Sequence, residues 1–224
     1  MKMRTCCCAF ALLLLSVPTY ADSITFSSRA AFNAAAPGLP VETFESGLVA
    51  AGSSTSCNGP LSSASASPCF PAGGLLPGAT YSAVPGLSNP NMILFGAGIL
   101  GATSKVLGPN FFADTLDITF TAPVTAVGLD AYGFSGIFAI SVFSSAGASL
   151  GNFTILSNVE PTFFGFLSTT DLIGRINVSS GGELVDNMAF GTPVPEPSSL
   201  LLVAGVLAIL LPLSYVRKRR THPR

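Results

Sequence analysis

The second half of the chain alternates between apolar and polar positions. Leu116, Ile118 and Phe120 are separated by polar residues, and the run ends at Pro123. A period of two is typical of a strand with one buried face. Six more candidate strands follow, with turn signals between them and starts 9 to 13 residues apart, at 124–132, 137–144, 149–156, 162–167, 172–178 and 184–190. Short strands at this spacing, without helices between them, predict an all-β fold, an antiparallel β-sandwich of the jelly-roll type rather than a barrel.

The first half has fewer regular elements. Short strands are predicted at 24–26, 41–45, 79–84 and 91–96, whereas 99–107 is ambiguous. One short N-terminal helix is predicted over residues 28–35, because a serine can cap the alanine-rich turns and Pro37 with Gly38 ends them. Residues 47–90 are otherwise rich in Gly, Ser, Ala and Pro, which predicts a long irregular insertion.

The chain begins with the features of a secretory signal peptide. Lys2 and Arg4 precede a 12-residue apolar segment, 6–17, and Thr19 and Ala21 are small residues at the positions that signal peptidase reads. We expect cleavage after Ala21, which removes residues 1–21. The segment is shorter than the roughly 20 residues of a membrane span. Its cysteines lie at its start, whereas a lipid-modified cysteine follows the apolar segment, so a lipoprotein signal is rejected.

A second apolar segment lies near the C-terminus. Residues 198–216 carry no charge, and these 19 residues would be roughly 28 Å long as a helix, close to the hydrocarbon thickness of a bilayer. This predicts a single transmembrane helix. The cations that follow hold that flank, residues 217–224, in the cytoplasm: Arg217, Lys218, Arg219 and Arg220. The body of the protein is therefore expected on the other side of the membrane.

Between the body and this span, residues 193–197 contain Pro195, Glu196 and Pro197, and the prolines favour extended backbone. This triplet, followed by one apolar span and an Arg-rich end, resembles the PEP-CTERM sorting signal, also named the ice-binding protein C-terminal domain. The resemblance implies export by the secretion machinery and cleavage near the triplet by an exosortase, a protease of the inner membrane. The product would reach the cell surface or the extracellular matrix. The alternative is a type I membrane anchor that is never cut.

The part between the two apolar segments is acidic. Residues 22–194 hold three cations, Arg29, Lys105 and Arg175, against ten carboxylates, a net charge of −7, although the whole chain is formally −1. Nucleic acid and anionic membrane surfaces are therefore excluded as partners, because binding to phosphates depends on Lys and Arg. A length of about 170 residues suffices for one domain with one core, which we assign to residues 22–192.

Two cysteines remain after export. Cys57 and Cys69 flank 11 residues that are mostly Ser, Ala, Gly and Pro. An even pair of cysteines in an oxidising compartment predicts a disulfide. Closing a loop of this size stabilises the fold by roughly 3 kcal/mol or less. Zinc binding by the pair is rejected, because a zinc site needs four ligands and residues 22–194 contain no His.

Five short segments of the secreted part carry a second resemblance: 29–32, 43–45, 123–128, 163–166 and 185–191. They resemble other PEP-CTERM proteins and carbohydrate-binding modules of the jelly-roll type. In those modules a Phe-Glu near the first strand and an Asp in the last strand share a structural Ca²⁺. The resemblance therefore implies Glu45 and Asp186 as ligands, with backbone carbonyls or water completing the roughly 6 to 8 oxygens. The alternative is that both carboxylates are solvated or hydrogen-bonded at strand ends.

The residue inventory limits catalysis. The sole histidine, His222, lies in the basic tail, so no Ser-His-Asp or Cys-His site can form in the secreted part. A pair of carboxylates, Asp114 with Asp117 or Glu183 with Asp186, stays formally open as a glycosidase site. Asp114 and Asp117 are three positions apart on a strand, however, and point to opposite faces. We predict that the protein is not an enzyme.

Two functions remain. The first is a structural protein of the cell surface or of the exopolysaccharide matrix, and the second is a module that binds a glycan through its loops or a sandwich face. Tyr81 and Tyr132 are the candidate stacking aromatics, since the chain has no Trp. Ice binding has no support, because no regular Thr-rich repeat is present. Several phenylalanines are predicted to fill the core: Phe138, Phe143, Phe163, Phe164 and Phe166.

Overall fold

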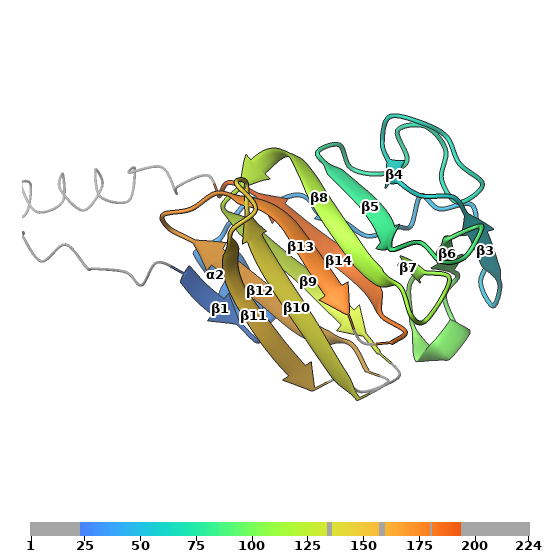
Figure 1. The fold of residues 1–224 in the computed structure, drawn as a ribbon. Helices are drawn as coiled ribbons and strands as arrows, with labels where there is room; N and C mark the ends of the chain where they lie inside the picture. The colour runs from blue at the N-terminus through green and yellow to red at the C-terminus, as the bar shows by residue number, and fades with distance from the viewer. Residues whose placement is uncertain (1–22, 134–135, 157–159, 180, 194–224) are drawn as a thin grey trace, which may run out of the picture.

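The computed structural model describes residues 23–133, 136–156, 160–179 and 181–193, which form two antiparallel β-sheets packed face to face (Figure 1). The first sheet runs in the order β1 (Ser23–Phe26), β12 (Thr162–Ser168), β9 (Ala126–Tyr132), β14 (Leu184–Gly191), β7 (Val106–Pro109), β6 (Met92–Phe95) and β3 (Ser54–Cys57), with β2 (Val41–Glu42) also paired to β14. The second sheet runs in the order β11 (Ser149–Leu156), β10 (Ile137–Ser144), β13 (Ile173–Ser179), β8 (Thr115–Val124), β5 (Ala79–Val84) and β4 (Leu61–Ser62).

The antiparallel sandwich expected from the sequence is confirmed, and so are the strands of the second half. The long insertion contains two short strands that the sequence pattern does not predict, β3 and β4, which pair with β6 and β5. The ambiguous segment 99–107 divides into a 3₁₀ turn, η2 (Ile99–Gly101), and the start of β7. Residues rich in Ser and Gly carry no clear alternation, so pairing with neighbouring strands decides their conformation.

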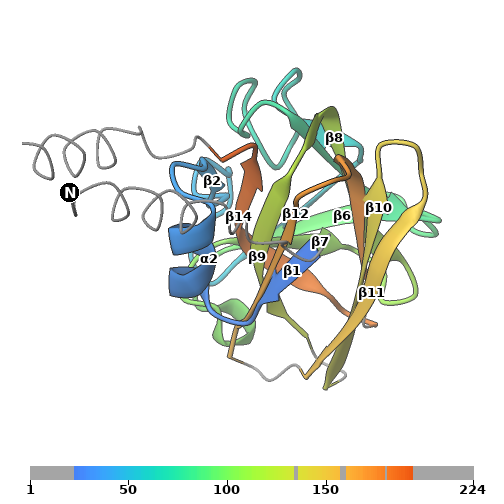
Figure 2. The same ribbon diagram turned by 90° about the vertical axis from the view of Figure 1, so that its left-hand side faces the viewer.

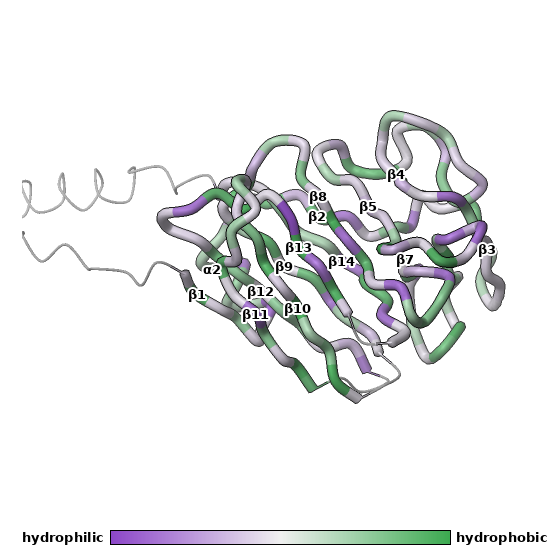
Figure 3. Tube along the Cα trace, in the orientation of Figure 1, coloured by the Kyte–Doolittle hydropathy of each residue, from purple (hydrophilic) through white to green (hydrophobic). Residues whose placement is uncertain are grey.

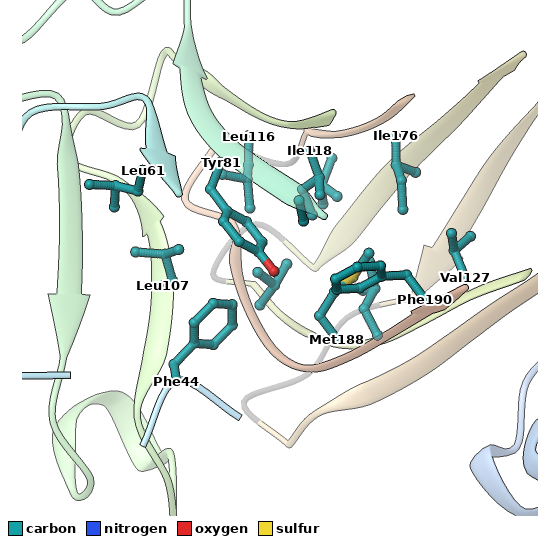
Figure 4. Packing of buried hydrophobic residues seen from close by; sticks show 14 of the residues in the cluster. Phe44, Leu61, Tyr81, Leu107, Leu116, Ile118, Val127, Ile176, Met188 and Phe190 are labelled. Carbon is teal, nitrogen blue, oxygen red and sulfur yellow. The ribbon is translucent and has the colours of Figure 1, made fainter. Parts of the chain in front are cut away.

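One large apolar core lies between the sheets. Leu116 and Ile118 of the second sheet and Val127 and Met188 of the first belong to it (Figure 4). Three of the phenylalanines predicted to fill the core belong to it: Phe138, Phe164 and Phe166. Phe163 is also buried, but it packs against Phe32 on the outer face of the first sheet. The prediction for Phe143 is wrong. Its neighbour Val142 takes the inward position, so the Phe143 ring lies on the outer face and packs against a guanidinium group.

The predicted helix is present as α2 (Arg29–Ala35), which covers part of the outer face of the first sheet (Figure 2). Its Phe32 is fully buried. Gly128 of β9 and Gly165 of β12 are register partners and lie beneath this ring. A Cβ atom on Gly128 would lie 2.8 Å from the Phe32 ring, and one on Gly165 would lie 2.7 Å from it. The two glycines therefore form the hollow that accepts the helix.

The predicted disulfide joins Cys57 and Cys69, with a Cα–Cα distance of 5.9 Å, and both cysteines are buried. Within the described residues no helix is long and apolar enough to cross a bilayer. Several predictions fall outside the described residues: the signal peptide with its cleavage site at Ala21, the motif Pro195, Glu196 and Pro197, the span 198–216 and the basic residues 217–220.

Both ends of the described body lie at the same end of the sandwich. Gly191, near the end of β14, pairs with Ala126, which pairs with Leu167, which in turn pairs with Ile24 in β1. These four residues form one row across the first sheet. The chain therefore enters and leaves the sandwich on one side, and the opposite end and the outer face of the second sheet are remote from both connections (Figure 1).

Tyr81 places its hydroxyl in the core without a hydrogen-bond partner among the described residues. Its ring meets Phe44 edge-on at 5.4 Å between centroids (Figure 4). Because an unpaired buried hydroxyl is unfavourable, we expect Tyr81→Phe to leave the free energy of unfolding unchanged or to raise it by up to about 1 kcal/mol in urea titrations. Tyr132→Phe is the matched control. The Tyr132 hydroxyl is hydrogen-bonded to Ser104, so this variant should lose about 1 kcal/mol. Equal losses in both variants would contradict the prediction.

Candidate functional site on the outer face of the second sheet

A row of polar side chains crosses five strands of the second sheet. Strand register aligns its members on β5, β8, β13, β10 and β11: Ser82, Asp117, Asn177, Ser141 and Asn152. They alternate with core residues and therefore point to the outer face. Four inter-strand steps of about 4.8 Å give the row a length of roughly 19 Å. Figure 3 shows hydrophilic segments, in purple, on the neighbouring strands β8 and β13. We call this set the polar row.

Asp117 is held in place within the row. Its Oδ2 accepts a hydrogen bond from Nη1 of Arg175 at 2.8 Å, and its Oδ1 accepts one from Nδ2 of Asn177 at 2.6 Å. The Asn177 amide also donates to Oγ1 of Thr115 at 2.8 Å. Both hydrogens of the Asn177 side-chain amide are therefore already donated. Its side-chain carbonyl oxygen accepts no hydrogen bond from the described residues. That oxygen is available to accept a hydrogen bond from a ligand.

Arg175 lies beside the row and is held on two sides. Its guanidinium lies 4.0 Å from the centroid of the Phe143 ring, and its side chain is 39% exposed. The ring and the ion pair with Asp117 together keep the planar guanidinium in one orientation, so little side-chain entropy is left to lose when it donates to a ligand. The outer face thus combines fixed donors with fixed acceptors.

This face carries several kinds of hydrogen-bonding group. The polar row supplies hydroxyl, amide and carboxylate groups, and Arg175 adds a charged donor next to it. Groups of this kind pair with ligand hydroxyls, which both donate and accept. The sequence could have revealed the outward positions from strand alternation alone. It could not reveal that these five positions share one row, because the order of strands in the sheet is not readable from local pattern.

Asp114 and Glu183, named from the sequence as candidate catalytic carboxylates, both hold backbone N–H groups. Asp114 is buried just before β8, and its carboxylate accepts from the backbone of Gly86 at 3.1 Å and of Leu87 at 2.9 Å. Glu183 is also buried and accepts from the backbone N–H of Leu116 at 3.0 Å. Asp114 therefore stabilises the loop after β5 next to the start of β8, and Glu183 stabilises the start of β8 next to β14.

Glu45 and Asp186, the carboxylates implied as calcium ligands, both accept hydrogen bonds from the protein. Oε1 of Glu45 accepts from the backbone N–H of Lys105 at 2.9 Å, and the Lys105 ammonium donates to the Glu45 carbonyl at 2.7 Å. Asp186 is fully buried and accepts from the backbone N–H of Asn187 at 2.6 Å and from the Ser104 hydroxyl. An ion would have to compete with the Lys105 ammonium for the oxygens of Glu45. The calcium site stays a prediction, tested by the heat and melting-temperature change when Ca²⁺ is added to chelator-treated protein.

Asp186 makes stability depend on pH. Burial, followed by the charges of Asp130 and Glu45, raises the pKa of Asp186 from 3.8 to about 6, although hydrogen bonds from Ser104 and Asn187 act in the opposite direction. Between these values the folded state binds the proton more tightly than the unfolded chain. The stabilisation by protonated Asp186 is thus full below about pH 4 and is lost as the pH rises through about 6.

When the pH rises from about 4 to about 7, we expect the free energy of unfolding to fall by about 1 to 3 kcal/mol more in the wild type than in Asp186→Asn. The asparagine cannot ionise but keeps an acceptor for the Asn187 backbone N–H. Urea unfolding of both proteins at the two pH values measures the difference, and subtraction removes the titration of other groups. An identical pH dependence in the two proteins would contradict the prediction.

The remaining candidates are less suited to a polar ligand. Tyr81 and Tyr132 are at most 6% exposed, so neither offers a ring face for stacking, and the expectation from the sequence is corrected. A pocket of about 250 Å³ lies near the ends of β6, β7 and β14, lined by Ile93, Phe95, Leu100, Pro109, Phe112 and Leu184 among others. Its walls are mostly apolar, and it is smaller than most ligand sites.

No protein-family model and no curated protein sequence matches the chain. Among solved structures, a mutant of a carbohydrate-binding module of family 29 is 17% identical with a TM-score of 0.33, over 51% of this chain and 94% of that one. Another mutant of such a module, complexed with mannohexaose, is 15% identical with a TM-score of 0.36, over 62% of this chain and 93% of that one. The enzymatically active domain of a bacteriophage tailspike protein is 17% identical with a TM-score of 0.27, over 50% of this chain and 17% of that one. Likeness of this degree carries no functional argument.

Proposed function

We propose that the chain is an exported, non-enzymatic protein that a PEP-CTERM tail sorts to the cell surface or extracellular matrix, where it binds polysaccharide. The polar row carries the binding part of this proposal. It is long, formed by side chains on five hydrogen-bonded strands, and bordered by an arginine whose orientation is already set. Binding groups on strands are more precisely placed than groups on loops, so an extended ligand meets a preformed surface.

The charge of the body narrows the class of polysaccharide. Residues 22–194 carry a net charge of −7, which opposes strongly anionic polymers. The row offers one carboxylate, and that group is already paired with Arg175. A neutral, hydroxyl-rich chain that lies across the strands fits these groups best. We propose the exopolysaccharide of the host as the ligand. During sorting, the partners are the exosortase and the inner membrane.

The arrangement of the ends supports surface display. Because the described chain enters and leaves at one end of the sandwich, a leader and a sorting tail attach on that side and leave the outer face of the second sheet accessible. The jelly-roll topology, the transmembrane helix at 198–216 and cleavage near Pro197 belong to the same proposal. Intact-mass analysis of the protein from its host tests the sorting step: an end near Pro197 supports cleavage, whereas a complete C-terminus identifies a permanent type I anchor.

We expect Asn177→Ala to weaken binding of the host polysaccharide roughly tenfold or more, because it removes an acceptor and releases Asp117 from one of its donors. Calorimetry or a pull-down with the isolated polysaccharide measures the effect. Thr121→Ala, an exposed change on β8 outside the polar row, is the control and should bind as the wild type does. Equal affinity of the two variants, or no saturable binding by the wild type, would reject the glycan-binding proposal and leave a structural matrix role.

A further inference from the structure

The second sheet has one long, unprotected edge. β11 pairs with β10, and no other described strand pairs with it. It is 8 residues long, whereas the other strands at the ends of the two sheets, β1, β3 and β4, have 4, 4 and 2 residues. An open edge is a template for pairing with another strand, and proteins usually block it with Lys, Pro or a bulge that twists it away.

Apart from one bulge near its start, at Leu150, β11 has none of the features that block an edge. Its residues, Ser149–Leu156, include no charge and no proline. Asn152, Thr154 and Leu156 face the solvent, and Leu156 is 75% exposed. Phe153 and Ile155 face the other way and pack against the core. Apart from Leu156, the solvent side of this segment is polar and the other side is apolar, as in a strand in the middle of a sheet.

We infer that a second copy of this chain pairs with β11, antiparallel and about a two-fold axis. The body is acidic, so most contacts between two copies repel, but β11 is uncharged and meets itself without like-charge opposition. In such a pair the outward residues of one copy adjoin the outward residues of the other. The two sheets then become one, part of the exposed Leu156 is covered, and the interface is isologous.

The pairing joins the binding faces of the two copies. Asn152 is the last member of the polar row and lies on β11, so the row of one copy continues into that of its partner. β11 begins near Ser144, Ile173 and Val124, at the end of the sandwich where the chain enters and leaves. Antiparallel pairing turns these ends in opposite directions. The dimer therefore links two copies that are attached to two opposed cell surfaces, or two copies that have been released from the membrane.

Association of the full chain, purified in a mild non-ionic detergent, tests the inference. We expect a dimer for the wild type at tens of micromolar by light scattering, and amide hydrogen exchange in residues 149–156 that slows as the concentration rises. Thr154→Lys places a cation on the edge of each copy and should weaken dimerisation roughly tenfold or more. Thr119→Lys, the same change at an exposed position on the central strand β8, should dimerise as the wild type does.

A charge-pair experiment makes the test specific. Thr154→Lys mixed with Thr154→Glu should form mixed dimers, seen by native mass spectrometry, more readily than either variant dimerises alone. A monomeric wild type overturns the inference. So does a dimer that is unchanged in Thr154→Lys, since association would then occur through another surface or through the apolar tail. Slowed exchange in 149–156 only when another protein is added would also overturn it, because the edge would then serve a different partner. Glycan binding is measured separately, so the two proposals fail independently.

Discussion

Replacing Glu42 by alanine is expected to lower the free energy of unfolding by about 3 to 5 kcal/mol, measured by urea denaturation. Glu42 is 4% exposed. Its Oε1 accepts from the backbone N–H of Phe44 at 2.8 Å, and its Oε2 accepts from that of Leu76 at 2.5 Å. Alanine leaves the buried N–H of Phe44 and the part-buried N–H of Leu76 without their acceptor. Phe44 has a φ of 56°, in the left-handed region, which phenylalanine disfavours. The Glu42 carboxylate therefore also stabilises an unfavourable backbone conformation.

Two further variants separate this cause from a general effect of losing a carboxylate. Glu42→Gln keeps one oxygen but turns an amide N–H₂ toward the second donor, so a loss between that of alanine and the wild type is expected. Glu45→Ala removes a carboxylate with an exposed side chain three positions along the chain and should lose about 1 kcal/mol or less. If Glu45→Ala lost as much as Glu42→Ala, the explanation by buried backbone donors would be wrong.

Phe32→Ala is expected to lower the free energy of unfolding by about 3 to 5 kcal/mol. The ring is fully buried and packs against Phe26 and Phe163, at 5.7 and 5.6 Å between centroids. Alanine would leave the hollow over Gly128 and Gly165 empty, because the backbone of two paired strands cannot collapse into it. The same urea titrations measure the loss. Leu172→Ala, at a residue 47% exposed, should change stability by about 1 kcal/mol or less and serves as the control.

A double-mutant cycle tests the hollow itself. Gly165→Ala brings a Cβ atom to 2.7 Å from the Phe32 ring and should destabilise the wild type by about 1 to 3 kcal/mol. In the Phe32→Ala background most of this clash disappears, so the same change should cost less, with a coupling energy of about 0.5 kcal/mol or more. Additive losses would show that the helix does not depend on the paired glycines.

Alternation along the chain predicted the strands of the second half, and the apolar character of phenylalanine predicted the burial of four of the five that were named. Where alternation is interrupted, the prediction failed. Residues 41–45 were expected to form one strand, but β2 ends at Glu42, because the carboxylate of that residue accepts from the backbone N–H of Phe44. Phe143 was placed in the core because a large aromatic is usually buried, whereas Arg175 covers it on the outer face.

Part of the candidate site could be predicted from the sequence and part could not. The outward polar character of Asp117, Ser141 and Asn177 is visible in the sequence, since each is flanked by apolar residues. Their alignment in one row is not visible there. β5, β8, β13, β10 and β11 are neighbours although up to dozens of residues separate them along the chain, and the register of each pair was decided by packing of the inner face.

The amino-acid sequence by itself determined the class of fold, the disulfide between Cys57 and Cys69, and the acidic, histidine-free chemistry of residues 22–194. These follow from local periodicity and from the inventory of residues, which need no knowledge of neighbours in space. Only the tertiary structure decided the polar row, the buried cap of Glu42, the hollow beneath Phe32 and the open edge of β11. Each of these depends on which distant segments lie side by side, and contacts between distant segments leave no periodic signal in the sequence.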